Sequence, residues 1–167
     1  MSTRRSLLHC RSGSAAAEMA LVLPFLVLLL FGGVELGYYF YNQHQVVKGV
    51  RDGARYAGRQ SFVSLNCDGG APSTVPDDVE TAIQEITRTG RISGGTARVP
   101  GWVNGDITVT ITCPTTPITT GIYEDEDNAP QVNVAATVSY DSLFDGVGVI
   151  DSTYTLRASQ QAAVMGI

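Results

Sequence analysis

The fold is decided by residues 14–34, which read SAAAEMALVLPFLVLLLFGGV. The part from Met19 to Val34 holds sixteen residues without a charge, and the small residues before it extend the weakly polar stretch to 21 residues. A helix needs roughly 20 such residues to cross the hydrocarbon core of a bilayer. So many leucines in succession leave no polar face for a soluble amphipathic helix. We therefore predict a membrane-spanning helix, with the aromatic residues 38–41 at its outer interface.

The charged residues fall into blocks around this stretch. Residues 1–13 carry three arginines and no acid, residues 48–59 carry four bases and one acid, and residues 60–167 carry thirteen acids against four bases. Only 16% of the chain is charged and its formal net charge is −5, whereas ordinary soluble domains are about 25% charged. The acidic outer part argues against nucleic-acid binding, which requires a positive surface. The blocks predict a leader (1–13), a transmembrane and juxtamembrane helix (14–60) and a globular domain (61–167).

A cleaved secretory signal is the first alternative for the N-terminus. Arg4, Arg5 and Arg11 supply a basic region, but no A-x-A cleavage site follows the leucines. A lipoprotein anchor is disfavoured because Cys10 precedes the apolar stretch instead of following it. The positive-inside rule gives only weak support to a cytoplasmic N-terminus, since basic residues flank the span on both sides.

One carboxylate, Glu18, lies inside the weakly polar stretch, where an ionised side chain costs about 2.5–3.5 kcal/mol at mid-bilayer. If a peptidase cuts between Gly13 and Ser14, the new α-ammonium of Ser14 and the Glu18 carboxylate can neutralise each other, within one chain or between neighbouring helices. The alternative is a carboxylate that reaches water at the membrane surface. We expect this second, solvated state for Glu35, at the far edge of the span.

These features resemble the N-terminal signal of type IV pilins and pseudopilins, with a short basic leader, a glycine before the cut, a glutamate at the fifth mature position and a long apolar helix. Three further segments narrow the resemblance, namely ALVLP at 20–24, GVELG at 33–37 and DGARYA at 52–57. Together they are similar to the TadE family, the minor pilin-like proteins of tight-adherence (Flp) pilus systems. The resemblance covers about residues 10–60.

The resemblance implies a bacterial inner-membrane protein with a cytoplasmic N-terminus and a periplasmic domain. It implies cleavage between Gly13 and Ser14 by a prepilin peptidase, charge neutralisation at Glu18, and assembly or initiation of the pilus together with other pilins. Ser14 stands where many mature pilins have phenylalanine, and Met19 follows Glu18 where major Flp pilins have tyrosine. We therefore expect a minor subunit and not the main subunit of the fibre.

Two faces of the long helix are candidates for contacts with other subunits. Gly33 and Gly37 form a small-xxx-small pair, which permits close approach of two helices. Apolar residues at three- and four-residue steps predict that the helix continues to about residue 58, with glycines at 49, 53 and 58 as sites of bends. The bases of 48–59 occupy much of the remaining face. This basic face is expected to be solvated, or to meet acidic surfaces of neighbouring subunits or lipid phosphates.

Residues beyond 61 are rich in Gly, Thr, Pro and Val, which is typical of an exported β-rich domain. Apolar residues between 79 and 86 predict one amphipathic helix that ends at Gly90. Strict alternation predicts strands at 107–113, 132–140 and 154–158. We therefore predict an α+β protein, in which the long N-terminal helix is followed by a small domain with an antiparallel sheet and one covering helix.

The cysteines and large aromatic residues of this domain are assigned structural roles. Cys67 and Cys113 are the pair that remains when Cys10 is lost with the leader, and we expect them to form a disulfide in an oxidising compartment. Two unrelated buried thiols are the alternative. Trp102 and Phe144 are expected in the core or at the edge of the sheet.

No residue set points to catalysis. The two histidines, His9 and His44, have no acid–base partner nearby, and the motifs of zinc proteases, serine hydrolases and phosphate-binding loops are missing. The acidic run 124–128 has oxygen ligands that suit calcium but lacks the spacing of an EF-hand, so we expect a solvated loop. We expect no enzyme activity, cofactor, metal or small-molecule substrate. Two alternative functions remain open. One is a membrane-anchored periplasmic binding module that never enters a filament, and the other is an exported hydrolase or metal-dependent enzyme in 61–167.

Overall fold

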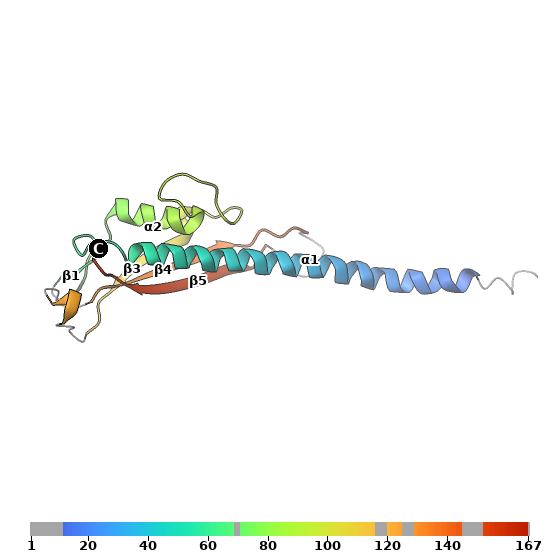
Figure 1. The fold of residues 1–167 in the computed structure, drawn as a ribbon. Helices are drawn as coiled ribbons and strands as arrows, with labels where there is room; N and C mark the ends of the chain where they lie inside the picture. Colours follow the sequence, from blue (N-terminus) through green and yellow to red (C-terminus); the bar gives the residue numbers. More distant parts are fainter. Residues whose placement is uncertain (1–11, 69–70, 116–119, 125–128, 145–151, 167) are drawn as a thin grey trace, which may run out of the picture.

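The computed structural model describes residues 12–68, 71–115, 120–124, 129–144 and 152–166. Helix α1 runs from Ser12 to Ala57 and is followed by a small domain of three-stranded antiparallel sheet and a second helix. The α+β class predicted from the sequence is therefore confirmed. The N-terminal half of α1 extends alone away from the domain, and its C-terminal half lies along the sheet (Figure 1).

The sheet contains β3 (Ile107–Thr112), β4 (Gln131–Ser139) and β5 (Thr155–Ala163) in that spatial order. All neighbours are antiparallel, and β5 pairs along the whole of β4, from Ser139↔Thr155 to Gln131↔Ala163. The second half of β5 extends beyond the predicted strand. Its residues 159–163 read SQQAA and lack the apolar alternation by which a strand is recognised, so pairing with β4 determines their conformation.

Helix α2 runs from Asp77 to Thr89, as the periodicity predicted. Three acids occupy its first turn, where they favour the positive end of the helix dipole. Gly90 ends the helix with φ of 82°, and its N–H donates to the Ile86 carbonyl. Glycine adopts this left-handed conformation without steric cost, which explains the stop at this residue.

One apolar core joins α1, α2 and the inner face of the sheet. Trp102 is 1% exposed and lies in this core, whereas Phe144 is half-buried beside α1. Burial of such side chains contributes about 1.5–3 kcal/mol each. Helix α1 contributes its C-terminal half to the core through four residues, Val46, Val50, Ala54 and Ala57.

Glycines 49 and 53 are points of close packing in a continuous helix, and not bends. A Cβ at Gly49 would overlap the Thr87 carbonyl of α2 and the ring of Trp102, and one at Gly53 would overlap the Thr87 side chain. The ion pair between Arg98 and Asp52, at 2.8 Å, closes the same contact from outside. Because Gly49 and Gly53 have no side chain, α2 can pack closely against α1.

The predicted disulfide between Cys67 and Cys113 is present, with Cα atoms 5.8 Å apart. Cys67 belongs to a short hairpin of β1 (Cys67–Asp68) and β2 (Ala71–Pro72), and Cys113 follows the last residue of β3. The bond therefore ties the segment after α1 to the central domain. The remaining short elements are two 3-10 turns, η2 (Asn104–Asp106) and η3 (Gly121–Tyr123).

Candidate assembly site on the N-terminal helix

The apolar stretch of α1 is exposed. Leu21 and Leu29 present 72% and 70% of their surface, and between residues 15 and 30 every side chain is exposed. The helix is long and apolar enough to cross a membrane by length and composition. Such a surface is unfavourable in water, so the fold is compatible with single-pass anchoring by this segment.

The residues predicted to guide processing and assembly lie at the start of α1. Gly13 and Ser14 fall in its first turn, and Glu18 lies about one turn later with an exposed side chain. The three residues therefore share one continuous helix. Cleavage between Gly13 and Ser14 and charge neutralisation at Glu18 stay predictions.

Gly33 and Gly37 lie one turn apart on the exposed part of α1. Among the described residues, no heavy atom outside the local helix lies within 4 Å of a Cβ placed at either position. This contrasts with Gly49 and Gly53, whose space is filled by α2 and Trp102. The surface at 33 and 37 is open, as a helix-packing surface between subunits requires, and its use in such packing stays a prediction.

The expectation for Glu35 was wrong, because this carboxylate is buried and not solvated. Its residue is 3% exposed, and its Oε1 accepts hydrogen bonds from the Tyr140 hydroxyl at 2.7 Å and the Leu143 N–H at 3.3 Å. Hydrogen bonds to an ionised acceptor are about twice as strong as neutral ones. The chain that leaves β4 therefore folds back onto α1 directly after the apolar stretch, which ends at Val34.

Tyr140 is the residue of the domain whose hydroxyl donates a hydrogen bond to Glu35. Burial raises the pKa of its hydroxyl, and the adjacent Glu35 carboxylate raises that pKa further. The hydroxyl therefore stays protonated over the physiological pH range and acts as the donor. Tyr140 follows β4 directly, and its N–H donates to the Tyr154 carbonyl at 3.0 Å, which fixes its position beside β5.

An aromatic cluster surrounds this contact. The rings of Tyr38 and Tyr39 lie 6.1 and 5.2 Å from Tyr140, and Phe31 meets Phe144 edge-to-face at 4.8 Å. Such pairs contribute about 0.5–1.5 kcal/mol beyond the area they bury. The aromatic belt predicted at 38–41 is thus divided, since residues 38 and 39 pack on the domain while residues 40 and 41 are exposed.

Hydrogen bonds attach α1 and the residue after it to the domain at several points along the helix. Nearest the apolar stretch, Glu35 binds Tyr140 and Leu143. Further along, Gln43 Nε2 donates to the Arg157 carbonyl of β5 at 2.9 Å, and at the far end the Met165 N–H donates to the Gly58 carbonyl at 2.8 Å. Because one helix carries both the apolar stretch and these contacts, a force on its N-terminal part is transmitted to the domain.

Sequence reasoning chose candidate residues on the exposed half of α1 and missed the buried contact between Glu35 and Tyr140. Glu35 and Tyr140 are 105 residues apart, and no periodicity links positions so distant. The one available signal was a carboxylate between an apolar span and a run of tyrosines that lacked a basic partner nearby in sequence. A metal site was not expected, and among the described residues no group of three or more potential metal ligands comes together. Most of the acidic run 124–128 lies outside the described residues.

The comparisons with known proteins bear on this same helix. Residues 13–55 match the family model described as TadE-like protein. No curated protein and no solved structure is significantly similar to the chain. The matched range begins at Gly13 and ends where α1 has joined the domain, and it contains Glu18 and Glu35. TadE-like proteins are pilin-like and structural, and not a family of enzymes. The resemblance drawn from the sequence is thus confirmed, and residues 13–55 of this chain form a TadE-like helix.

Proposed function

We propose that this protein is a minor pilin-like subunit that assembles or initiates a tight-adherence (Flp) pilus. In this proposal residues 1–13 are a cytoplasmic leader, 14–60 cross and leave the bacterial inner membrane, and 61–167 form the periplasmic domain. A prepilin peptidase removes the leader, and the mature helix then packs with other pilins through Glu18, Gly33 and Gly37. No cofactor and no small-molecule substrate takes part.

The observation that supports the proposal most is the construction of α1. Its TadE-like segment carries an exposed apolar half and a half fixed to the domain, within one uninterrupted helix. Extraction of a subunit from a membrane into a filament requires that a pull on the helix also moves the domain. The contacts of Glu35, Gln43 and Gly58 with the domain supply that coupling.

The proposed processing predicts a mature N-terminus at Ser14. We expect intact-mass measurement of the protein purified from its own membranes to show loss of residues 1–13. A Gly13→Leu variant should keep the leader, because the bulky side chain disturbs the position before the cut, while Gly105→Leu serves as a control at another exposed glycine. A wild-type protein that retains Met1–Gly13 in cells with active pilus assembly would exclude the pilin route.

Replacement of Glu18 separates anchoring from assembly. Glu18→Ala removes a charge that opposes insertion by about 2.5–3.5 kcal/mol at most, so we expect membrane fractionation to recover the variant as efficiently as the wild type. The partner of the Ser14 α-ammonium is lost, and electron microscopy should show fewer pili per cell. The matched control is Glu124→Ala, which removes an exposed carboxylate of the domain. Normal piliation with Glu18→Ala would contradict the proposed pairing.

A membrane-anchored binding module that never enters a filament is the alternative. The processing experiment distinguishes the two, because such a module has no reason to lose its leader and keep its helix. The retained leader together with an unchanged pilus count in cells that lack the protein would favour the module.

A further inference from the structure

One face of α1 outside the apolar stretch concentrates positive charge. We call it the basic face, and it consists of Lys48, Arg51 and Arg55 of α1 together with Arg59 in the turn directly after it. These residues recur at three- and four-residue steps and are exposed. Like charges at such spacing destabilise a helix. The domain of residues 61–167, by contrast, has a large excess of carboxylates. Positive and negative charges are therefore separated within one molecule.

Among the described residues, no ion pair joins the basic face to an acid of the same chain. Among the residues that the structure describes, the ion pairs join Arg88 to Glu85 and Arg98 to Asp52, each at 2.8 Å. Asp52 is the one acid on this part of α1, and it turns toward Arg98 on the α2 side. Within the described part of the chain, the basic face is thus available to an acidic partner.

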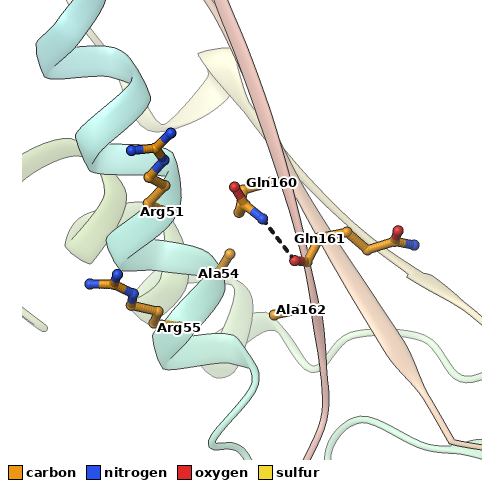
Figure 2. Close-up of a pocket in the computed structure, with 6 residues that line it drawn as sticks. All are labelled: Arg51, Ala54, Arg55, Gln160, Gln161 and Ala162. Atoms are coloured by element: carbon orange, nitrogen blue, oxygen red, sulfur yellow. Dashed lines mark hydrogen bonds between the residues drawn. The ribbon is translucent and has the colours of Figure 1, made fainter.

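The surface beside the basic face is hollowed. Figure 2 shows Arg51 and Arg55 at the rim of a hollow between α1 and β5, with Ala54 and Ala162 facing each other across it. The hollow has a volume of about 250 Å³ and opens to the surface. Gln160 and Gln161 complete its lining, so the hollow presents polar groups and two arginines to a side chain of a neighbouring molecule.

Distance from the membrane excludes lipid phosphates as the partner. Lys48 lies 14 residues beyond Val34 and Arg59 lies 25 residues beyond it, which places the basic face about 21–37 Å outside the apolar stretch at 1.5 Å per residue. The Debye length at physiological ionic strength is about 8 Å. The partner must therefore be an acidic surface that stands at the same height above the membrane.

A second copy of this chain presents such a surface. Asp77 and Asp78 are exposed in the first turn of α2. Helix α2 runs antiparallel to α1 (Figure 1), and Ile83 and Thr87 lie against Gly53. Five residues from Ile83 back to Asp78 add about 7.5 Å, and this brings Asp78 to the height of Arg59.

The two surfaces lie on different sides of α1. Helix α2 packs on the side of Gly49 and Gly53, whereas the hollow of the basic face opens toward β5. A contact between the α2 side of one copy and the β5 side of the next is heterologous. It leaves the β5 side of the first copy and the α2 side of the second copy free for further copies. Contacts of this kind extend into rows, rings or helical filaments instead of closing as a dimer.

We propose that the basic face of one copy binds Asp77 and Asp78 of a second copy standing beside it in the membrane. The shared height of the two surfaces rests on the proposed single-pass anchoring, and the contact identifies a partner for the pilin-like subunit. Arg55 and Arg59 bind the two carboxylates, and the hollow beside Ala54 accommodates the start of the neighbour's α2. This contact sets the lateral spacing of the subunits.

Cross-linking of the full-length protein in liposomes tests the contact. In a Cys10→Ser background the remaining native cysteines are joined in the disulfide, so engineered cysteines react alone. Copies carrying Arg55→Cys are mixed with copies carrying Asp78→Cys and treated with a short bis-maleimide. The control replaces Arg55→Cys by Thr108→Cys, which is exposed on β3. We expect at least about fivefold more mixed dimer than in the control, as for a specific contact.

Charge reversal decides whether electrostatics holds the contact. Arg51→Glu and Arg59→Glu in the Arg55→Cys copy should lower cross-linking about tenfold, and Asp77→Lys in the Asp78→Cys copy should restore it. Arg91→Glu, at an exposed position elsewhere, should change nothing. Equal cross-linking of the control pair or insensitivity to charge reversal would overturn the proposal. N-terminal sequencing of the same samples reports cleavage at Ser14 separately, so failure of the contact and failure of the pilin function are distinguishable.

Discussion

Replacing Glu35 by alanine is expected to lower the free energy of unfolding of the domain by about 2–4 kcal/mol, because the buried Tyr140 hydroxyl loses its charged acceptor and the missing side chain leaves a cavity. The substitution leaves the buried Tyr140 hydroxyl and the part-buried Leu143 N–H without the carboxylate as their acceptor. It also leaves empty the space between α1 and the chain after β4. Typical domains are stable by only about 5–15 kcal/mol, so a loss of this size is a large fraction of the total. We expect the contact between α1 and the domain to loosen before the rest of the fold.

Urea unfolding in detergent micelles measures this effect. Trp102 is the only tryptophan and is buried in the core, so its fluorescence reports unfolding of the domain. Glu35→Gln keeps the shape and an acceptor oxygen, and should cost only about 1–2 kcal/mol. Tyr140→Phe removes the donor and keeps the ring, with an expected cost of about 1.5–3 kcal/mol.

Glu124→Ala is the matched control for Glu35→Ala, because Glu124 is an exposed glutamate of the same domain. A surface change of this kind stays within about 0.5 kcal/mol. If Glu35→Ala and Glu124→Ala unfold at the same urea concentration, the buried carboxylate does not fix α1 to the domain. The coupling of α1 and the domain would then depend on the remaining contacts, which include the core residues of α1, the Arg98–Asp52 ion pair and the hydrogen bonds of Gln43 and Gly58.

Removing the disulfide with Cys67→Ala and Cys113→Ala together should lower the free energy of unfolding by about 4 kcal/mol. The two cysteines are 46 residues apart, and in the chain-entropy model a cross-link over that separation restricts the unfolded chain by this amount. The link spans the segment that contains α2, so its loss frees the unfolded chain around the whole helix. The same urea titration, followed by Trp102, measures the difference.

Reduction provides the control for the cysteine variant. Dithiothreitol should shift the unfolding midpoint of the wild type toward that of the double variant and leave the double variant unchanged. A Cys10→Ser variant should behave as the wild type, because Cys10 lies outside the disulfide. Equal stability of the oxidised wild type and the double variant would show that the cross-link does not limit unfolding.

The sequence by itself determined the parts of the protein that depend on local composition. The uncharged run from Met19 to Val34 predicted an anchor, because membrane insertion depends on summed transfer free energy and not on neighbours in space. The period-2 pattern located β3 and β4, and the period-3.6 pattern located α2. Each pattern can be read from the sequence because each element buries one face. The start of the helix, with Gly13 and Glu18, carried the TadE-like pattern.

Only the tertiary structure decided what depends on residues far apart in sequence. Glu35 looked like a solvated carboxylate, and its burial follows from Tyr140, which lies 105 residues away. Gly49 and Gly53 looked like weak points of a helix, and they are the contact that admits α2. In each case the stabilising free energy comes from the contact between two segments and not from either segment alone. Sequence patterns report the preferences of a segment, whereas the packed fold determines which segments meet.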